Sequence, residues 1–247
     1  MTREDWFGVL DQGAGVGVRA VQMVGGEPTM HPDFGDLVEH ALTLGLTVEV
    51  FSNLVHVSPA NWDLFQRPGV RLATSYYSDD EAEHNAITGR DSHRKTRANI
   101  ARALELGIPV RTGVIAVQES QRVQQARADL KGLGIAQTGT YSLRHFGRGQ
   151  GEHPACDLAE LCGRCGDGRA AIGPDGAVSP CIMSGWLKAG SVRTTPLADI
   201  LSGEEMAGLT ATIPTRLKSD PCGPDDGPCG PSDNCAPDAY PCYPSNE

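Results

Sequence analysis

The sequence predicts an α/β fold that is built on a parallel sheet and followed by a small cysteine-rich region. In the first 150 residues, apolar strand-like runs alternate with segments that carry apolar residues at helical spacing. All eight cysteines lie between Cys156 and Cys242. Eight of the 17 prolines fall in residues 214–247, where ordinary helix or sheet is therefore not expected. These patterns predict two domains, residues 1–150 and 151–247.

Five short runs are rich in β-branched residues and are predicted to be strands. The first, VRAVQMV, ends at a pair of glycines, and the second, LTVEVFS, ends at Ser52 and Asn53. Glycine, serine and asparagine are typical of the turns that follow strands. The five predicted strands cover residues 18–24, 46–52, 70–75, 109–117 and 137–143.

The segments beside these strands are predicted to be helices. Residues 3–14 place Trp6, Val9 and Leu10 at helical spacing. Pro32 suits the start of a helix, and an apolar stripe follows it: Phe34, Leu37, Val38, Ala41 and Leu42. Further helices are predicted at about 58–66, 92–106 and 120–132.

Strands that alternate with helices imply right-handed crossovers and a parallel sheet, as in a partial α/β barrel or a doubly wound sheet. In both folds ligands bind at the carboxyl ends of the strands. Polar residues and glycines follow all five predicted strands. These residues are Gly25 to Pro28, Ser52 and Asn53, Thr74 and Ser75, Gln118 and Glu119, and Arg144 to Gly149.

The charge of the chain argues against some classes of partner. The chain has 21 Lys and Arg against 31 Asp and Glu, a formal charge of -10, whereas a nucleic acid or an anionic membrane requires a basic face. No uncharged apolar run approaches the roughly 18 residues that a membrane span needs. The opening MTREDWFGVL is too acidic for a signal peptide, so we expect a cytoplasmic protein.

The cysteine spacing predicts a metal site. Cys162 and Cys165 form a C-x2-C pair, and Cys165-x10-Gly176-x4-Cys181 follows, with a hairpin turn at residues 173–176. The tail then carries four C-x-P units in a stretch that is too polar to fold by burial. The eight candidate ligands are Cys156, Cys162, Cys165, Cys181, Cys222, Cys229, Cys235 and Cys242.

Three interpretations of these cysteines compete. Disulfides suit an even number of cysteines, but the chain shows no secretion signal. Structural zinc favours paired C-x2-C knuckles, and the sequence contains one. Iron–sulfur clusters, which thiolates hold in irregular loops rich in glycine and proline, could use all eight cysteines as two sets of four. Iron–sulfur binding is therefore the favoured prediction.

The tetrapeptide Gly25-Gly26-Glu27-Pro28 suits a small ligand that carries a cationic amine. Adjacent glycines let the backbone approach a ligand, the carboxylate can hold an ammonium group, and the proline fixes the turn. The same sequence in a plain turn is the simpler interpretation.

Together, the βα region, the GGEP segment and the cysteine-rich appendage resemble the radical S-adenosylmethionine (SAM) enzymes that carry a C-terminal SPASM domain. The resemblance implies a partial parallel (β/α) barrel of the radical SAM type and a small SPASM-like iron–sulfur domain with auxiliary [4Fe-4S] clusters. It also implies that Gly25, Gly26, Glu27 and Pro28 bind the amino group of SAM. Weaker matches place Ser52 and Asn53 beside the cofactor, Ser75 near the ribose and Arg144 near the methionine carboxylate.

The chain departs from the family in its cysteines. The motif C-x3-C-x2-C, which binds the SAM cluster in the family, does not occur, because no cysteine precedes Cys156. No strand is predicted before the helix at 3–14 either, so we infer that the first βα unit of the barrel is missing. An internal start in the gene model and a genuine loss both fit this pattern. The tail cysteines also depart from the usual SPASM spacing, so their pairing into clusters stays open.

The resemblance implies a SAM-dependent radical enzyme that modifies a ribosomally made peptide or protein and takes electrons from a donor such as flavodoxin or ferredoxin. With the cluster motif absent, this chain is expected to be inactive, and no catalytic residue is assigned. The alternatives are a non-catalytic iron–sulfur or peptide-binding scaffold and a zinc-stabilised interaction module. The loop histidines are expected to be solvated or capping residues: His31, His56, His84, His93 and His145.

Overall fold

The computed structural model describes residues 1–144 and 158–214, which form two compact units. The sheet unit comprises Arg19–Leu143. The hairpin unit combines Met1–Val18 with Arg144 and residues 158–214. Helix α1 (Arg3–Gly15) thus belongs to the same unit as the C-terminal region, although it falls within the predicted 1–150 domain. The predicted boundary near residue 150 remains a prediction.

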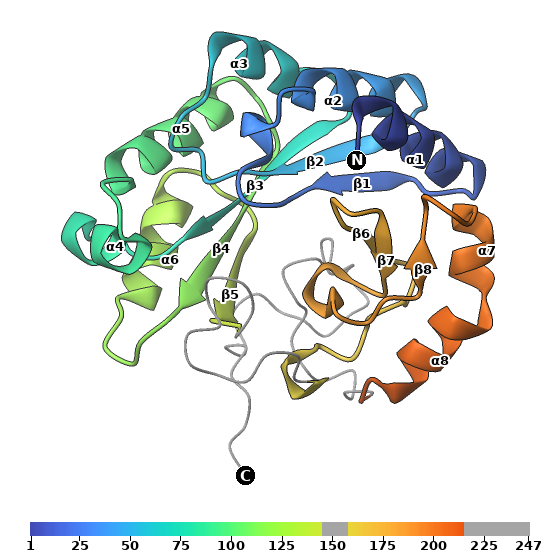
Figure 1. Cartoon of the computed structure of the whole chain (residues 1–247). Helices are drawn as coiled ribbons and strands as arrows, with labels where there is room; N and C mark the ends of the chain where they lie inside the picture. The colour runs from blue at the N-terminus through green and yellow to red at the C-terminus, as the bar shows by residue number, and fades with distance from the viewer. Residues whose placement is uncertain (145–157, 215–247) are drawn as a thin grey trace. The chain divides into compact units, whose positions relative to one another are not determined.

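The sheet unit contains a five-stranded sheet whose strands lie in sequence order, β1-β2-β3-β4-β5 (Figure 1). All four neighbouring pairs are parallel. The predicted α/β fold with a parallel sheet is therefore confirmed. The strands are β1 (Ala20–Met23), β2 (Thr47–Phe51), β3 (Val70–Tyr76), β4 (Val110–Ala116) and β5 (Thr138–Ser142).

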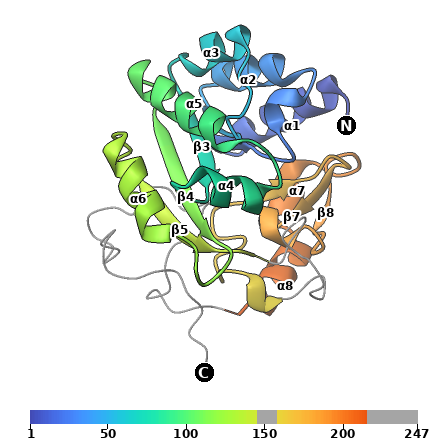
Figure 2. The same cartoon turned by 90° about the vertical axis from the view of Figure 1, so that its left-hand side faces the viewer.

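The helices of the sheet unit cover one face of the sheet (Figures 1 and 2). On that face, Val48, Val50 and Leu72 are fully buried, and α2 and α3 pack on β2 and β3. A doubly wound sheet would carry helices on both faces, so the arrangement is that of a barrel wall. The helices are α2 (Phe34–Thr43), α3 (Pro59–Phe65), α4 (Glu81–Thr88), α5 (His93–Glu105) and α6 (Val123–Gly132), with the 3-10 turn η1 (Pro28–Met30) after β1.

Helix α4 is an element that the sequence analysis did not predict. Its sequence, EAEHNAIT, has no apolar stripe, because the side chain that it buries is that of His84. Asp80 caps its N-terminus by accepting a hydrogen bond from the backbone N–H of Glu83, with 2.8 Å between the heavy atoms. The helix therefore depends on its cap and on one polar buried residue.

His84 and His93 are buried, so the expectation that they are solvated or capping residues is wrong. Their exposed fractions are 2% and 6%, and their rings lie 5.1 Å apart between centroids. The hydroxyl of Tyr76, at the end of β3, hydrogen-bonds with Nε2 of His93 (2.8 Å) and donates to Asp129 Oδ2 (2.9 Å). His31 and His56 are exposed as expected, and His145 lies outside the described residues.

The buried position of His84 predicts acid sensitivity. Burial, with the nearby His93, lowers the pKa of His84 to about 4, from an ordinary value near 6.5. His84 is thus neutral in the folded state, and the stability that it contributes is present above pH 6.5 and lost as the pH falls toward 4. A shift of this size corresponds to about 3 kcal/mol.

Urea unfolding between pH 7 and pH 4 tests this effect. The His84→Phe variant is expected to lose less stability over this interval than the unchanged protein, because it removes a group that is neutral when buried and takes up a proton on unfolding. His56→Gln, at an exposed position, is the control and is expected to follow the unchanged protein. An equal loss of stability in all three proteins would contradict the prediction.

The other face of the sheet carries two glycines on neighbouring strands. Gly113 on β4 pairs with Gly139 on β5, and Tyr141 lies one step further along the same face of β5. A Cβ atom at Gly139 would lie 2.1 Å from the Tyr141 hydroxyl oxygen, and one at Gly113 would lie 3.0 Å from its ring. A side chain at either position would therefore require the ring of Tyr141 to move.

The hairpin unit contains α1, a small three-stranded antiparallel sheet and two further helices. Thr2 and Asp5 form a capping box at the start of α1. Gln12 accepts a hydrogen bond from the backbone N–H of Leu197 (2.8 Å), which ties α1 to the start of α7. Its later elements are η3 (Leu158–Glu160), β6 (Ala171–Ile172), β7 (Ala177–Ser179), η4 (Ile182–Ser184), β8 (Gly190–Ser191), α7 (Leu197–Ser202) and α8 (Glu204–Thr212). Within residues 1–144 and 158–214, no helix is both long and apolar enough to cross a membrane.

Candidate functional site

The predicted ligand segment Gly25 to Pro28 lies directly after β1, at the carboxyl end of the sheet. Gly25 and Gly26 are exposed, and nothing lies within 4 Å of the position where either would carry a Cβ atom. Glu27 caps η1, and Pro28 occupies its first turn. The Oε1 atom of Glu27 accepts hydrogen bonds from the Thr29 hydroxyl (2.8 Å) and the Thr29 backbone N–H (3.3 Å).

The end of β2 meets this segment through Asn53. The backbone N–H of Asn53 donates to Oε2 of Glu27 at 2.8 Å. Ser52 is buried, and its hydroxyl oxygen accepts from the N–H of Leu54 (3.1 Å), while Oδ1 of Asn53 accepts from the N–H of Val55 (2.8 Å). The structure therefore brings Glu27, Ser52 and Asn53 to one place at the ends of adjacent parallel strands.

The other two predicted cofactor residues are Ser75 and Arg144. Ser75 is on β3, pairs with Gly113 and is half-buried. Arg144 belongs to the hairpin unit, where its guanidinium donates to the backbone carbonyl of Glu160 at 2.6 Å. The cofactor roles of Ser75 and Arg144 stay predictions.

The residues around Glu27 fit a cationic amine. A carboxylate has about four acceptor positions, and the protein uses three of them at Glu27. Neutral donors supply all three hydrogen bonds, so the negative charge of Glu27 is oriented by the protein without being paired to a cation in these contacts. With two glycines next to it, this carboxylate suits the ammonium group of an amino-acid-like ligand.

A second polar cluster lies on the face of the sheet opposite the helices, and the sequence analysis did not anticipate it. Glu49 on β2 is 1% exposed, and its carboxylate accepts from Nε (2.9 Å) and Nη2 (2.7 Å) of Arg111. Gln22 donates to the same carboxylate at 2.5 Å, and Nε of Arg71 lies 3.0 Å from its Oε1 atom. Strands β1 to β4 thus share one buried carboxylate.

The charge of Glu49 is maintained by this network. Burial acts to raise the pKa of its carboxyl group, but the hydrogen bonds and charge of Arg111, with Gln22 and Arg71, outweigh that effect. The pKa of Glu49 therefore lies below its ordinary value. The cluster links four strands, with Arg71 and Arg111 near the amino ends of β3 and β4 and Glu49 at the middle of β2.

In the hairpin unit, two of the predicted metal ligands lie side by side. Cys165 and Cys181 are buried free thiols whose Sγ atoms are 3.0 Å apart. Hydrogen bonds with Cys162 and Cys181, together with burial, raise the pKa of the Cys165 thiol. The hydrogen bond with Cys165 lowers the pKa of Cys181 to about 7 against the effect of burial, and Ser184 contributes in the same direction. Of the two thiols, that of Cys181 therefore ionises more readily.

The geometry of a hairpin explains the spacing between these cysteines. Strands β6 and β7 pair antiparallel, and Gly176 closes their turn with a φ of +85°, a conformation that favours glycine. The segment after β7 then lies beside the segment before β6, since the N–H of Gly166 donates to the carbonyl of Pro180 at 2.9 Å. The residues next to this bond are Cys165 and Cys181.

The thiol pair fits a soft metal such as iron or zinc, which prefers thiolate ligands. Cys162 is a half-buried cysteine three positions before Cys165. Among the residues that the structure describes, no three His, Cys, Asp or Glu side chains form a complete metal site. The predicted ligands Cys156, Cys222, Cys229, Cys235 and Cys242 lie outside the described residues.

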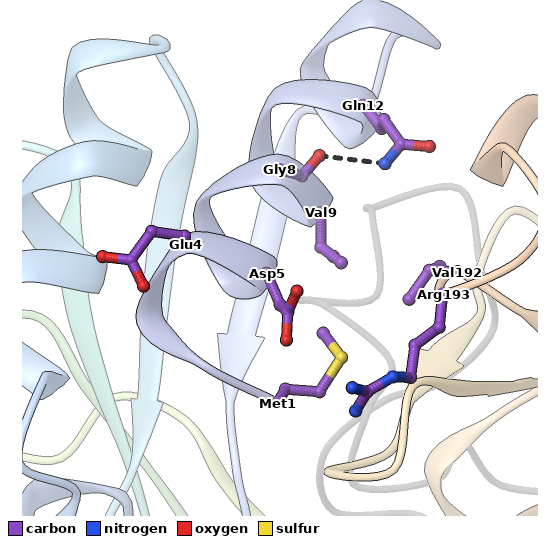
Figure 3. A pocket seen from close by; sticks show the side chains of 8 residues that line it. All are labelled: Met1, Glu4, Asp5, Gly8, Val9, Gln12, Val192 and Arg193. Atoms are coloured by element: carbon purple, nitrogen blue, oxygen red, sulfur yellow. Dashed lines mark hydrogen bonds between the residues drawn. The ribbon is translucent and has the colours of Figure 1, made fainter.

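A pocket of about 210 Å³ lies in the hairpin unit between α1 and the residues after β8 (Figure 3). Glu4 and Asp5 line it from α1, and Arg193 lines it from the opposite side. The charge of Arg193 is one of the smaller effects that keep the pKa of Asp5 below its ordinary value. The largest is the hydrogen bond from the Thr2 backbone. None of the sequence-predicted site residues lines this pocket.

Comparison with known families identifies the chain. Residues 1–125 match the radical SAM superfamily, and residues 162–229 match the SPASM iron–sulfur cluster-binding domain. The first match covers just over half of the 247 residues, and the chain belongs to the radical SAM superfamily. The expected family, its partial-barrel fold and its cofactors, [4Fe-4S] clusters and SAM, are confirmed at the level of the family.

Several characterised proteins are similar to this chain. A PqqA peptide cyclase of Streptomyces rochei is 28% identical over 236 residues, which cover 87% of this chain and 63% of that protein. SuiB of Streptococcus suis has a TM-score of 0.69 at 14% identity, over 84% of this chain and 61% of SuiB. SuiB bound to its precursor peptide SuiA has a TM-score of 0.64 at 13% identity, over 83% and 58%. The chain thus spans less than two thirds of each of these proteins, and the structural likeness shows the fold.

Proposed function

We propose that this chain takes part in the radical-based modification of a peptide or protein substrate. The observation that carries the proposal is the Glu27 carboxylate, which Thr29 and Asn53 orient at the carboxyl ends of β1 and β2 in a radical SAM fold. In this proposal Gly25, Gly26, Glu27 and Pro28 hold the amino group of SAM, with Ser52 and Asn53 beside them.

The hairpin unit has a separate role in the proposal. Cys165 and Cys181 hold part of an auxiliary [4Fe-4S] cluster, because the pair is buried, close and partly ionised near neutral pH. When bound, SAM supplies the radical source and the iron–sulfur cluster supplies electrons, and the protein positions both.

The substrate class follows from the relatives. A PqqA peptide cyclase is similar to 87% of this chain, and SuiB has been solved with a precursor peptide bound. We extend this substrate class to the present chain, together with an electron donor such as flavodoxin or ferredoxin. A cytoplasmic location belongs to the same proposal, because thiols and iron–sulfur clusters persist in a reducing compartment.

Anaerobic reconstitution with iron and sulfide tests the metal part of the proposal. The unchanged protein is expected to bind iron and sulfide and to show the visible absorption of an iron–sulfur cluster, whereas the Cys165→Ser/Cys181→Ser variant should lose at least half of the bound iron. Ser202→Ala, which changes a hydroxyl in α7, is the control and should bind iron normally. Binding of zinc without sulfide would favour a zinc-stabilised interaction module instead. Equal iron in all three proteins would exclude this thiol pair as ligands.

A further inference from the structure

The turn that follows β2, and that places Asn53 beside Glu27, has a strained backbone. Leu54 has a φ of +54°, the left-handed region that residues with a side chain rarely adopt, and its side chain is fully buried. A leucine persists in this conformation when the surrounding structure determines it. Leu54 directly follows Asn53, whose backbone N–H contacts Glu27.

Two side chains from α5 hold this turn. The hydroxyl of Thr96 donates to the backbone carbonyl of Asn53 at 2.9 Å, and Thr96 is 2% exposed. One turn further along the helix, the side-chain amide of Asn99 donates to the carbonyl of Leu54 at 2.7 Å. Two consecutive carbonyl groups of the turn are thus fixed by one face of α5.

Helix α5 is itself fixed to its neighbours. His93, at its first turn, hydrogen-bonds with Tyr76 of β3 (2.8 Å). Arg97 makes a two-pronged ion pair with Asp129 of α6, with N–O distances of 2.7 Å and 2.9 Å. The positions of Thr96 and Asn99 are therefore set by the sheet and by α6.

We propose that Thr96 and Asn99 are positioning residues for the Glu27 carboxylate. Both act through Asn53: its carbonyl is held by Thr96, the next carbonyl is held by Asn99, and its N–H then points at Oε2 of Glu27. The ligand of this site is the cationic amine of an amino-acid-like cofactor. The inference rests on the proposed function only in the identity of that ligand.

Amide hydrogen exchange of the full chain without ligand tests the coupling directly. The exchange rate of the Asn53 amide is expected to rise about tenfold in Thr96→Val, which keeps the shape of the side chain but removes the hydroxyl donor. Thr96→Ser keeps the hydroxyl and should restore the protection of Asn53. Glu27→Gln should raise the same exchange rate, because it weakens the acceptor of that amide.

Thr43→Val is the matched control. The hydroxyl of Thr43 also donates from a helix to a backbone carbonyl, that of His40 at 2.7 Å, but this contact lies within α2. The control should leave the Asn53 amide unchanged. Unchanged protection of Asn53 in Thr96→Val, with the loss of protection seen in Glu27→Gln, would overturn the inference.

Equilibrium dialysis with SAM separates the inference from the proposed function. The unchanged chain is expected to bind SAM, and Thr96→Val and Asn99→Leu should each bind about tenfold more weakly, while Thr96→Ser should bind normally. If no protein binds SAM, the SAM part of the proposed function fails, and the exchange data alone decide the positioning role. If Thr96→Val binds SAM as well as the unchanged protein, the positioning role toward SAM is wrong.

Discussion

The 247-residue chain by itself is expected to form no 5'-deoxyadenosine from SAM. In the radical SAM family, reductive cleavage requires a cluster held by three thiolates near the GGE segment, and residues 1–155 contain no cysteine. Along the chain, the first cysteine that the structure describes is Cys162, which follows the sheet unit and belongs to the hairpin unit. Glu27 is expected to orient the amine of SAM but cannot deliver an electron to it.

The measurement is 5'-deoxyadenosine after anaerobic reconstitution with iron, sulfide and dithionite. A longer chain with an in-frame C-x3-C-x2-C segment before Met1 is the positive comparison and should restore cleavage. Stoichiometric product from the 247-residue chain that disappears in Glu27→Gln would refute the expectation. It would mean that another set of ligands holds the cluster.

Replacing Glu49 by alanine is expected to destabilise the sheet unit by about 3–5 kcal/mol. The substitution leaves Arg111, whose side chain is 15% exposed, without the carboxylate that pairs with its guanidinium. It also removes the hydrogen-bond acceptor of Gln22 and the ion-pair partner of Arg71. The cost arises mainly from the uncompensated buried charge rather than from the loss of one attractive contact.

Glu39→Ala is the matched control for Glu49→Ala. Glu39 pairs with Arg67 on the surface, and the side chains are 42% and 52% exposed, so this change should cost less than about 1 kcal/mol. Urea unfolding at pH 7, followed by circular dichroism, measures both variants. Because the pKa of Glu49 lies below its ordinary value, its contribution is present at neutral pH and is lost as the pH falls below about 4. Similar costs for the two variants would show that the buried network contributes no more than a surface ion pair.

The fold was largely predictable because the core of the sheet unit follows simple periods. Val48 and Val50 are two positions apart and lie on the same buried face of β2, and Phe34, Leu37 and Val38 form an apolar stripe on α2. Helix α4 could not be found in this way, because its buried residue, His84, is polar. In the other elements of the sheet unit, strands alternate with helices along the chain, as a parallel sheet with helices on one face requires.

The site was predictable in part. Glu27 and Asn53 follow strands, and adjacent parallel strands end at the same edge, so their proximity follows from the fold. The roles of Glu49, Thr96 and Asn99 could not be read from the sequence. Each depends on a contact between residues at least 27 positions apart, and a charged residue in a strand or a polar residue in a helix is ordinarily exposed.

The placement of α1 has a consequence for the order in which the protein folds during synthesis. Val9 and Leu10 of α1 are buried, and Gln12 accepts a hydrogen bond from the backbone N–H of Leu197, which is 185 positions later in the chain. At a ribosome the helix emerges early, but its partner in α7 emerges only after the whole sheet unit has been made. The contact between α1 and α7 can therefore form only late in translation, and closing so long a loop is a slow step. The sheet unit can assemble first, and α1 meets its partner in α7 afterwards.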